Sequence, residues 1–403
     1  MLNAIGEGSQ RDMKMAFTSV AHKIKKKLLN WYKKDLDTNP SELFKKRHGQ
    51  LYAILLWKGF KRNKLALLGL IVLLIMFTCS ILAPFFSPNK ENYRELSRKY
   101  APPAKIHIFD DEGKYYGLFV YDYTSETDAL SGKRTYKPDK NTILPIQFFI
   151  KTEQYHLFNL IPLNRKLFGA VGGIWYPFGG DHQGRCVFSR IIFASRISLS
   201  IALFGAILTV VFGTSLGTIS GYFGGIIDTV LQRLIEIVIS FPRIPLWMAL
   251  AAAIPAGFSP VKEFFLISLV LSLLGWGGLA RQIRGVVLSL RDSDFVLAAK
   301  SYAASNNRIM FKHILPNILG VIIVNATILI PLMILGETAL SFLGLGLRPP
   351  ANSWGVLLKD AQAVHVLEKY PWLLIPGIFV VVSILSFNFI GDGLRDAVDP
   401  YKY

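Results

Sequence analysis

Six apolar runs that reach or approach the ~20 residues needed to cross a bilayer dominate the hydrophobic pattern of this 403-residue chain. They lie at about 65–84, 198–220, 228–254, 264–289, 316–336 and 371–391. The last five follow one another closely, whereas a long polar insertion at 87–194 follows the first. Hydrophobic residues make up 52% of the chain, which is high for a soluble protein of this length. The pattern predicts an all-α polytopic membrane protein with six spans.

Basic residues are concentrated ahead of the first run. Residues 1–63 carry fourteen Lys and Arg against five Asp and Glu, within a net charge of +18 for the whole chain. This distribution is the positive-inside signature of a membrane protein and argues against a nucleic-acid partner. It predicts a cytoplasmic N-terminal region at 1–63, a first transmembrane helix at 64–86 and, by alternation, a cytoplasmic tail at 393–403. Residues 13–34 would form either a basic amphipathic helix on membrane lipid or a solvated tail.

The insertion at 87–194 predicts a small extracytoplasmic domain rich in β-structure. Apolar and polar residues alternate from Ile106 to Tyr123, which is typical of strands. The closely spaced runs within 195–392 then form the main membrane domain. Cys79 lies in the first run and Cys186 far along the insertion, so we expect neither a disulfide nor a metal site.

A polar, basic segment from Asp294 to Asn317 interrupts the apolar pattern. We expect two short helices there, with Asp294 as the N-cap of 295–304 and Ser305 as the N-cap of 308–313. The turn between them falls at 306–307. Pro316 then lies in the first turn of the next span, where its missing N–H costs nothing.

Small side chains leave one surface of this segment nearly flat. They are Ala298, Ala299, Ala303 and Ala304. A flat, capped helix held just outside a membrane is a shape for docking another protein, so we expect the function to be most visible here.

Two patterns inside the spans concern helix packing and charge. Gly213, Gly217 and Gly221 recur every fourth position, a spacing that lets helix backbones approach closely in lipid. We interpret them as packing residues, with a pivot between moving helices as the functional alternative. Arg233 and Glu236 are three positions apart, so we expect a salt bridge on one helix. An ion path is the alternative, but a single pair near the membrane interface favours a structural role.

Enzymatic motifs are missing from the chain. It contains no GxxxxGK[ST] phosphate loop, no HExxH, no GxSxG and no clustered His and Cys residues. We therefore predict no catalytic residue and no metal ligand. An ion-coupled secondary transporter would require buried acidic residues and broken helices, which the pattern does not show. A membrane scaffold that has lost transport is a third class of function.

Five stretches, in order and with matching spacing, make the chain resemble binding-protein-dependent ABC importer permeases. The resemblance is to the C-type, or second, permease subunit of the dipeptide, oligopeptide and nickel group. The segment at 294–317 also matches the cytoplasmic signature of that family. The five stretches are FKRNKLALLGLIVLL (60–74), GGDHQGRCVFSRIIFASRISL (179–199), GYFGGIIDTVLQRLIEIVISFP (221–242), ETALSFLGLGLRPPANSWGVLL (337–358) and FNFIGDGLRDAVDP (387–400).

The resemblance implies the transmembrane domain of a type I ABC importer in a bacterial inner membrane. Such a subunit pairs with a second permease subunit, receives cargo from an extracytoplasmic substrate-binding protein and works with two cytoplasmic ATPase subunits. ATP and magnesium are expected on the ATPase subunits, and no cofactor is expected on this chain. Short peptides are the implied cargo, with nickel or another small solute as the alternative.

The resemblance also implies that the signature segment is a coupling helix that docks in a groove of one ATPase. Leu297 stands where the family usually has Glu, which implies a more apolar contact. Ala303 stands where it usually has Gly, and we expect this change to stiffen the helix. The residues assigned to docking are Asp294, Leu297, Ala298, Ala299, Ala303, Ala304, Ser305, Ile309, His313, Leu315 and Pro316.

Overall fold

The computed structural model describes residues 56–127, 134–157, 161–255 and 257–398. All elements given below belong to the unit that begins at Lys61. The amphipathic helix predicted at 13–34 lies outside the described residues.

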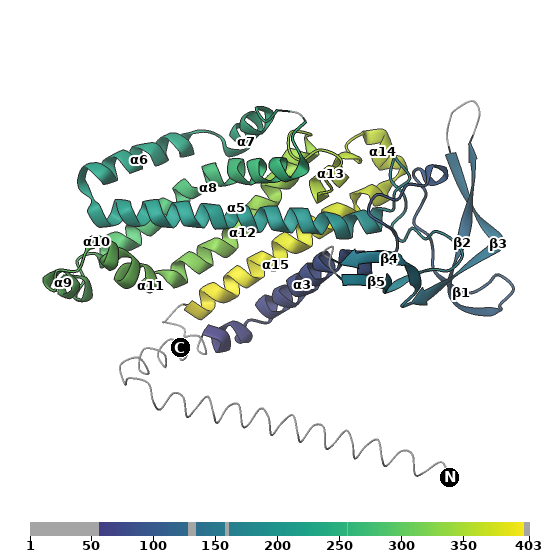
Figure 1. The fold of residues 1–403 in the computed structure, drawn as a ribbon, viewed down its shortest axis with the longest axis horizontal. Coiled ribbons are helices and arrows are strands. Elements are labelled where there is room, and N and C mark those ends of the chain that lie inside the picture. The colour runs from purple at the N-terminus through teal and green to yellow at the C-terminus, as the bar shows by residue number, and fades with distance from the viewer. Residues whose placement is uncertain (1–55, 128–133, 158–160, 256, 399–403) are drawn as a thin grey trace, which may run out of the picture. The chain divides into compact units, whose positions relative to one another are not determined.

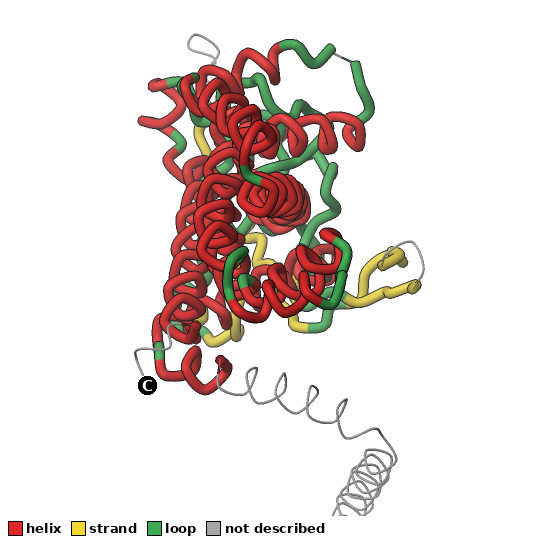
Figure 2. The backbone as a smooth tube through the Cα atoms, turned by 90° about the vertical axis from the view of Figure 1, so that its left-hand side faces the viewer, coloured by secondary structure: helices red, strands yellow, loops and turns green. Residues whose placement is uncertain are grey.

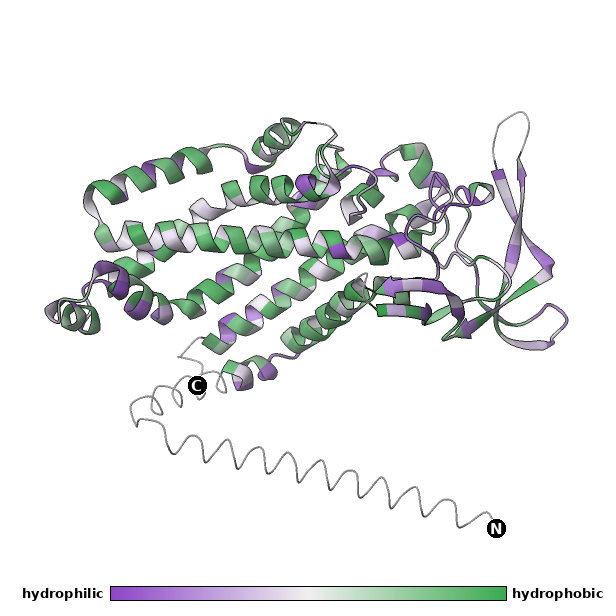
Figure 3. Cartoon of the chain, in the orientation of Figure 1, coloured by the Kyte–Doolittle hydropathy of each residue, from purple (hydrophilic) through white to green (hydrophobic). Residues whose placement is uncertain are grey.

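Long apolar helices form the main body of this unit. Within the described residues, five are long and apolar enough to cross a membrane, which confirms five of the six predicted spans. Figure 1 shows them running side by side, Figure 2 shows them from one end of the group, and Figure 3 shows that most of their positions are hydrophobic. They are α3 (Lys64–Ile81), α5 (Val187–Phe223), α8 (Pro260–Leu290), α12 (Leu319–Phe342) and a segment Pro371–Val398 that contains η3 (Pro371–Leu374) and α15 (Ile375–Val398).

The third predicted span is broken in two. Instead of one helix over 228–254, the chain forms α6 (Gly225–Ser240) and α7 (Arg243–Ala252), which meet at 86°. Phe241 adopts extended backbone angles, as residues before proline do, and Pro242 has no N–H to continue the helix. The described residues therefore contain five candidate spans, or six if this bent pair crosses as one.

α5 and α12 extend beyond the apolar runs that predicted them, and each helix buries a charged side chain in its additional length. α5 begins at Val187, well before residue 198, and includes the buried Arg190. α12 continues past residue 336, so Glu337 is 0% exposed instead of lying in the predicted outer loop. Glu263 of α8 is also buried. The expectation that the spans contain no buried acidic residue is therefore wrong.

The helices share a core centred on α5 and α8. Gly224, with a φ of +67°, ends α5 and turns the chain into α6. Beyond α5, the core includes side chains of α3, α7, α12 and α15, among them Leu73, Trp247, Met333 and Phe387. Burial of these apolar side chains fixes the helices against one another.

The insertion forms a small β-domain, as predicted. One antiparallel sheet has the order β1-β2-β3-β6, and β4 and β5 form a separate antiparallel pair. Val120, Leu144, Ile146 and Trp175 form its core. The strands are β1 (His107–Phe109), β2 (Tyr115–Thr127), β3 (Arg134–Phe148), β4 (Lys151–Leu157), β5 (Ile161–Arg165) and β6 (Phe168–Ala170).

Short helices connect these larger parts. They are α4 (Ala83–Phe86), η1 (Leu96–Arg98), α9 (Asp294–Ser301), α10 (Asn306–Arg308), the π-helix η2 (Ile309–Ile314), α11 (Leu315–Asn317), α13 (Trp354–Lys359) and α14 (Val364–Lys369). Figure 1 shows α9 and the strands at opposite ends of the long helices.

Candidate functional site

The helix α9 projects from one end of the long helices (Figure 1). Its inner side is held in place by Val296, which is fully buried, and Ala299, which is 9% exposed. Both pack in a cluster with Ile309 and Ile314 of η2 and with Val287 of α8. This packing holds α9 rigidly against the ends of two long helices.

The outer side of α9 carries large apolar groups that nothing in the described chain covers. We call Phe295, Leu297, Ala298 and Tyr302 the α9 surface. Leu297 is 49% exposed and Tyr302 is 87% exposed. Exposed apolar groups clustered in this way mark an interaction site. The predicted flat alanine surface is wrong, because Ala298 faces outward whereas Ala299 faces the core.

The ends of the two short helices differ in part from the prediction. Ser293 is the N-cap of α9, and Asp294 is its first residue, where a carboxylate still favours the helix dipole. Ser305 is confirmed as the N-cap of α10, since its hydroxyl accepts a hydrogen bond from the N–H of Arg308 at 3.4 Å. Residues 306–307 are helical, so the predicted turn lies earlier, at 302–305.

Ala303 makes the turn after α9 in a conformation that favours glycine. Its φ is +55°, in the left-handed region. Its N–H donates to the carbonyl of Lys300 at 2.9 Å, and the N–H of Ala304 donates to the carbonyl of Ala299 at 3.1 Å. These two bonds are the Schellman ending of a helix. Ala303 therefore lies outside the helix, and the prediction that it stiffens α9 is wrong.

The chain leads from this turn into α12 through a π-helix. Within η2, Ile309 and Ile314 are fully buried and His313 is half-buried. Leu315 and Pro316 form α11, one short turn before α12 begins at Leu319. The docking residues predicted beyond Ser305 thus connect α9 to a membrane helix, and several of them face the core.

The predicted glycines bring α5 and α8 into close contact. A Cβ at Gly217 would lie 2.5 Å from the carbonyl oxygen of Ala280, and one at Gly221 would lie 2.8 Å from that of Arg284. Gly213 meets the Leu279 side chain in the same way, at 2.8 Å. Larger residues would push the two helices apart, so the packing interpretation fits the geometry.

The predicted salt bridge of α6 is present. An Arg233 Nη atom lies 2.7 Å from an Oε atom of Glu236. The two side chains are 75% and 50% exposed, so the pair lies on the surface of a broken membrane helix.

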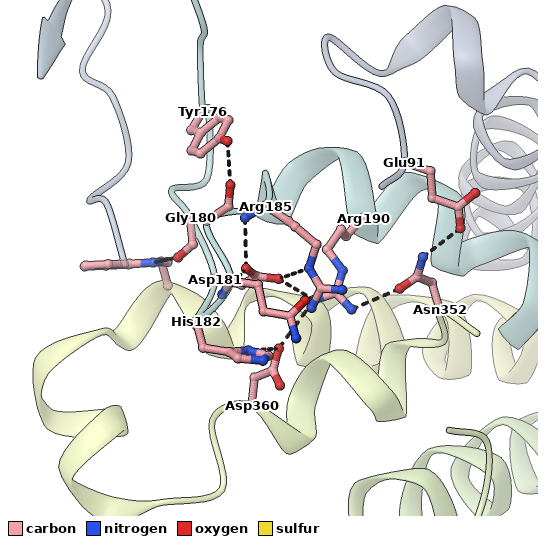
Figure 4. Close-up of polar contacts among 12 residues, drawn as sticks. Glu91, Tyr176, Gly180, Asp181, His182, Arg185, Arg190, Asn352 and Asp360 are labelled. Atoms are coloured by element: carbon pink, nitrogen blue, oxygen red, sulfur yellow. Dashed lines mark hydrogen bonds and ion pairs between the residues drawn. The ribbon is translucent and has the colours of Figure 1, made fainter. Parts of the chain in front are cut away.

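A buried polar network that the sequence patterns did not identify lies at the opposite end of the helices (Figure 4). Arg190 of α5 contacts Asp181 at 2.6 Å, Asp360 at 3.3 Å and the side-chain oxygen of Asn352 at 2.9 Å. Arg185 also binds Asp181, at 2.7 Å. The network ties the start of α5 to the segment around α13.

Charge within this network explains its stability. Burial opposes ionisation of Asp181, but the two arginines and the N–H of Arg185 hold the pKa of this carboxyl below its usual range. Asp181, His182 and Asp360 have ligand atoms within 4.8 Å of one another. Because the Arg190 guanidinium contacts both carboxylates, this cluster already contains a cation, and its geometry does not favour a metal ion.

Comparisons with known proteins cover most of the chain. Residues 213–401 match the family described as binding-protein-dependent transport system inner membrane component. Residues 52–103 match the N-terminal transmembrane domain of oligopeptide transport permease C.

Three relatives have names that refer to peptide transport. The dipeptide transport system permease protein DppC of Lactococcus lactis is 36% identical over 345 residues, 85% of this chain and 89% of that protein. DppC of Bacillus subtilis is 30% identical over 371 residues, 92% of each chain. The oligopeptide transport system permease protein OppC of Haemophilus influenzae is 44% identical over 227 residues, 56% of this chain and 70% of that protein. One solved structure also matches, an inward-facing MetNI methionine ABC transporter, over 52% of this chain and 97% of that chain. The sequence identity is 18% and the TM-score is 0.37, and this score is too low to support a conclusion about the fold or function of the chain.

Proposed function

Because the chain belongs to the family of permease subunits of dipeptide and oligopeptide ABC importers, we propose that it is the C-type permease subunit of an ATP-driven peptide importer. A second permease subunit completes the pathway, and an extracytoplasmic binding protein delivers short peptides to it. Two ATPase subunits bind ATP and magnesium, while this chain binds no cofactor and catalyses no reaction. Closure of the ATPases then moves the membrane helices between inward-facing and outward-facing states.

The α9 surface is the observation that carries this proposal. It is an apolar surface on a short helix that is packed rigidly against η2 and α8, so a push on α9 reaches membrane helices directly. We propose that it docks in a groove of one ATPase subunit. Leu297 offers that groove an aliphatic side chain, which makes the contact less dependent on salt than an ion pair would be.

The same proposal orients the chain in the bacterial inner membrane. The α9 end faces the cytoplasm, together with both termini, and the β-domain faces outward. Support comes from the basic residues of 1–63 and from the exposed Lys300, Arg308 and Lys312 near α9. The β-domain is then placed to contact the binding protein or the second permease subunit.

Cysteine crosslinking tests the docking surface with a matched pair of variants. In a Cys79→Ser, Cys186→Ser background, Ala298→Cys should crosslink to an ATPase subunit in membranes. Ala299→Cys, one residue further along the same helix but buried, should not. Equal crosslinking of both variants, or of neither while transport continues, would contradict the assignment of α9.

Uptake by the complete importer tests the cargo. Proteoliposomes that contain both permease subunits, both ATPases and the binding protein should accumulate a labelled dipeptide or oligopeptide only when ATP is present. Accumulation of nickel or another small solute without any peptide would overturn the proposed cargo and leave the subunit assignment intact.

A further inference from the structure

Three charged side chains line the contact between α6 and α8. We define the charged seam as Asp228 of α6 with Arg281 and Arg284 of α8. Both helices belong to the membrane-spanning part of the chain, α6 as half of the bent pair. Ionisable residues at such depth are costly in lipid and therefore face protein or water.

The register of the two helices places these charges close to one level. Arg284 binds Asp228 through two contacts of 2.5 Å, and a Cβ at Gly277 would lie 3.5 Å from the side chain of Ile235. Residue numbers rise along α6 as they fall along α8, so the helices are antiparallel. Arg281 follows Gly277 by four positions and precedes Arg284 by three, which places it on the side of α8 that faces α6. By this register it lies about one helical turn from the Asp228–Arg284 pair, whereas Arg233 and Glu236 lie outside the α6–α8 contact, with side chains that are 75% and 50% exposed.

Charge balance singles out Arg281. Asp228 pairs with Arg284, and Arg233 pairs with Glu236 at 2.7 Å. Among the residues that the structure describes, Arg281 is exposed and has neither an ion pair nor a side-chain hydrogen bond. The charged seam therefore carries one positive charge that the chain itself does not neutralise.

The surroundings of Arg281 are open and polar. Gly278 and Gly285 lie three positions before it and four after it, and a Cβ at either would meet nothing within 4 Å. Gln282 beside it is exposed. A polar stripe of this kind on a long membrane helix indicates contact with water and not with lipid chains.

The break between α6 and α7 points to the same interpretation. Its irregular backbone follows the charged seam along the chain, at Phe241 and Pro242. Non-helical backbone at membrane depth is tolerated where protein covers it or where it lines a water-filled cavity. Discontinuous helices of transporters commonly contribute to the substrate site.

We propose that the charged seam faces the aqueous translocation pathway and that Arg281 binds the C-terminal carboxylate of the peptide in transit. This inference rests on the proposed peptide-importer function and extends it to a specific contact. A guanidinium suits this ligand because it donates two parallel N–H bonds to a carboxylate.

Transport of a peptide and of its C-terminal amide tests the contact. Both are supplied at saturating concentration to the reconstituted importer, and the ratio of their rates is compared between the parent and Arg281 variants. The preference of the binding protein cancels in this comparison because the same binding protein is used throughout. Arg281→Gln should lower the peptide-to-amide ratio by about tenfold, whereas Arg281→Lys should lower it less, because the charge remains but the second parallel N–H bond is lost.

Thiol labelling tests the exposure to water independently. In the Cys79→Ser, Cys186→Ser background, Gln282→Cys should react with a membrane-impermeant thiol reagent, and peptide should slow the reaction. Ile71→Cys is the control, because Ile71 is an exposed apolar residue in the middle of α3, which takes no part in the α6–α8 contact. It should not react.

Three results would overturn the inference. They are an unchanged peptide-to-amide ratio in Arg281→Gln, an unreactive Gln282→Cys, and loss of the second permease subunit from complexes of both Arg281 variants. The last result would assign Arg281 to a subunit interface. Failure of the parent importer to transport any peptide would instead overturn the proposed function itself.

Discussion

Replacing Ala303 by glycine should stabilise the end of α9. Ala303 adopts a φ of +55° at the position that follows the helix C-cap, Tyr302, where glycine has no Cβ to clash with the backbone. The left-handed conformation costs an alanine about 1–2 kcal/mol. Glycine loses about 0.4–1 kcal/mol of this gain through the greater freedom of the unfolded chain. The net stabilisation should therefore be about 0.5–1 kcal/mol.

Amide hydrogen exchange reports this change where it occurs. The N–H groups of Ala303 and Ala304 close the Schellman ending, so they exchange when this turn opens. A gain of about 0.5–1 kcal/mol corresponds to exchange that is roughly two- to fivefold slower in Ala303→Gly. Exchange measured by mass spectrometry on the purified protein in detergent, over peptides that contain residues 300–305, would show it.

The same substitution five residues earlier provides a matched control. Ala298 is exposed and lies inside α9, so Ala298→Gly should destabilise the helix by about 1 kcal/mol and speed exchange. Opposite signs for the two Ala→Gly variants are the expected result. Faster exchange in both variants would refute the left-handed assignment of Ala303 and restore the view that it lies within the helix.

Packing and charge elsewhere in the chain lead to three more outcomes. Gly217→Ala should lower the free energy of unfolding by about 1–3 kcal/mol, because its Cβ would lie 2.5 Å from a backbone oxygen of α8. Gly278→Ala, on the open side of α8, should leave the free energy of unfolding unchanged. Equal melting temperatures of these two variants would contradict the close packing of α5 on α8. Burial lowers the pKa of Lys166 to about 8. Between pH 8 and the ordinary lysine pKa, the unfolded chain therefore binds more protons than the folded chain. The free energy of unfolding should rise with pH across that range. Lys166→Met should lack this rise and be more stable at pH 7, by about 1–3 kcal/mol in calorimetry. Arg190→Gln should cost about 3–5 kcal/mol because it removes one of the two arginines that pair with the buried Asp181, whereas Lys90→Gln removes an exposed ion pair and should cost under about 1 kcal/mol.

The membrane helices could be predicted from the sequence because lipid permits few alternatives. An apolar run in a bilayer must satisfy its backbone hydrogen bonds internally, so helix is the expected result. The ends of α5 and α12 could not be predicted in the same way. Arg190 and Glu337 resemble boundary residues until their partners are known, and Asn352 lies 162 positions from Arg190. Long-range pairs of this kind leave no local pattern.

Other differences between the predicted and observed helices had local signals in the sequence, but the hydrophobic pattern outweighed them. The Phe241–Pro242 dipeptide marks the break between α6 and α7, but an unbroken apolar run favoured a single helix. Ala303 is a subtler case, because alanine is a strong helix former and only the backbone angle shows where α9 ends. The exposed side of α9 depends on which residues η2 covers, and a π-helix has no reliable sequence pattern.

The length of α5 has a mechanical consequence. Its 37 residues extend about 55 Å, well beyond the roughly 30 Å hydrocarbon layer. Close contact at three glycines fastens it to α8, so the two helices behave as one stiff lever with the buried Arg190 network at one end and α9 near the other. A rotation of about 10° around the middle of this lever would carry each end by about 5 Å, on the scale of one helical turn. Motion too small to disturb helix packing at the pivot would thus reposition both surfaces of the protein together.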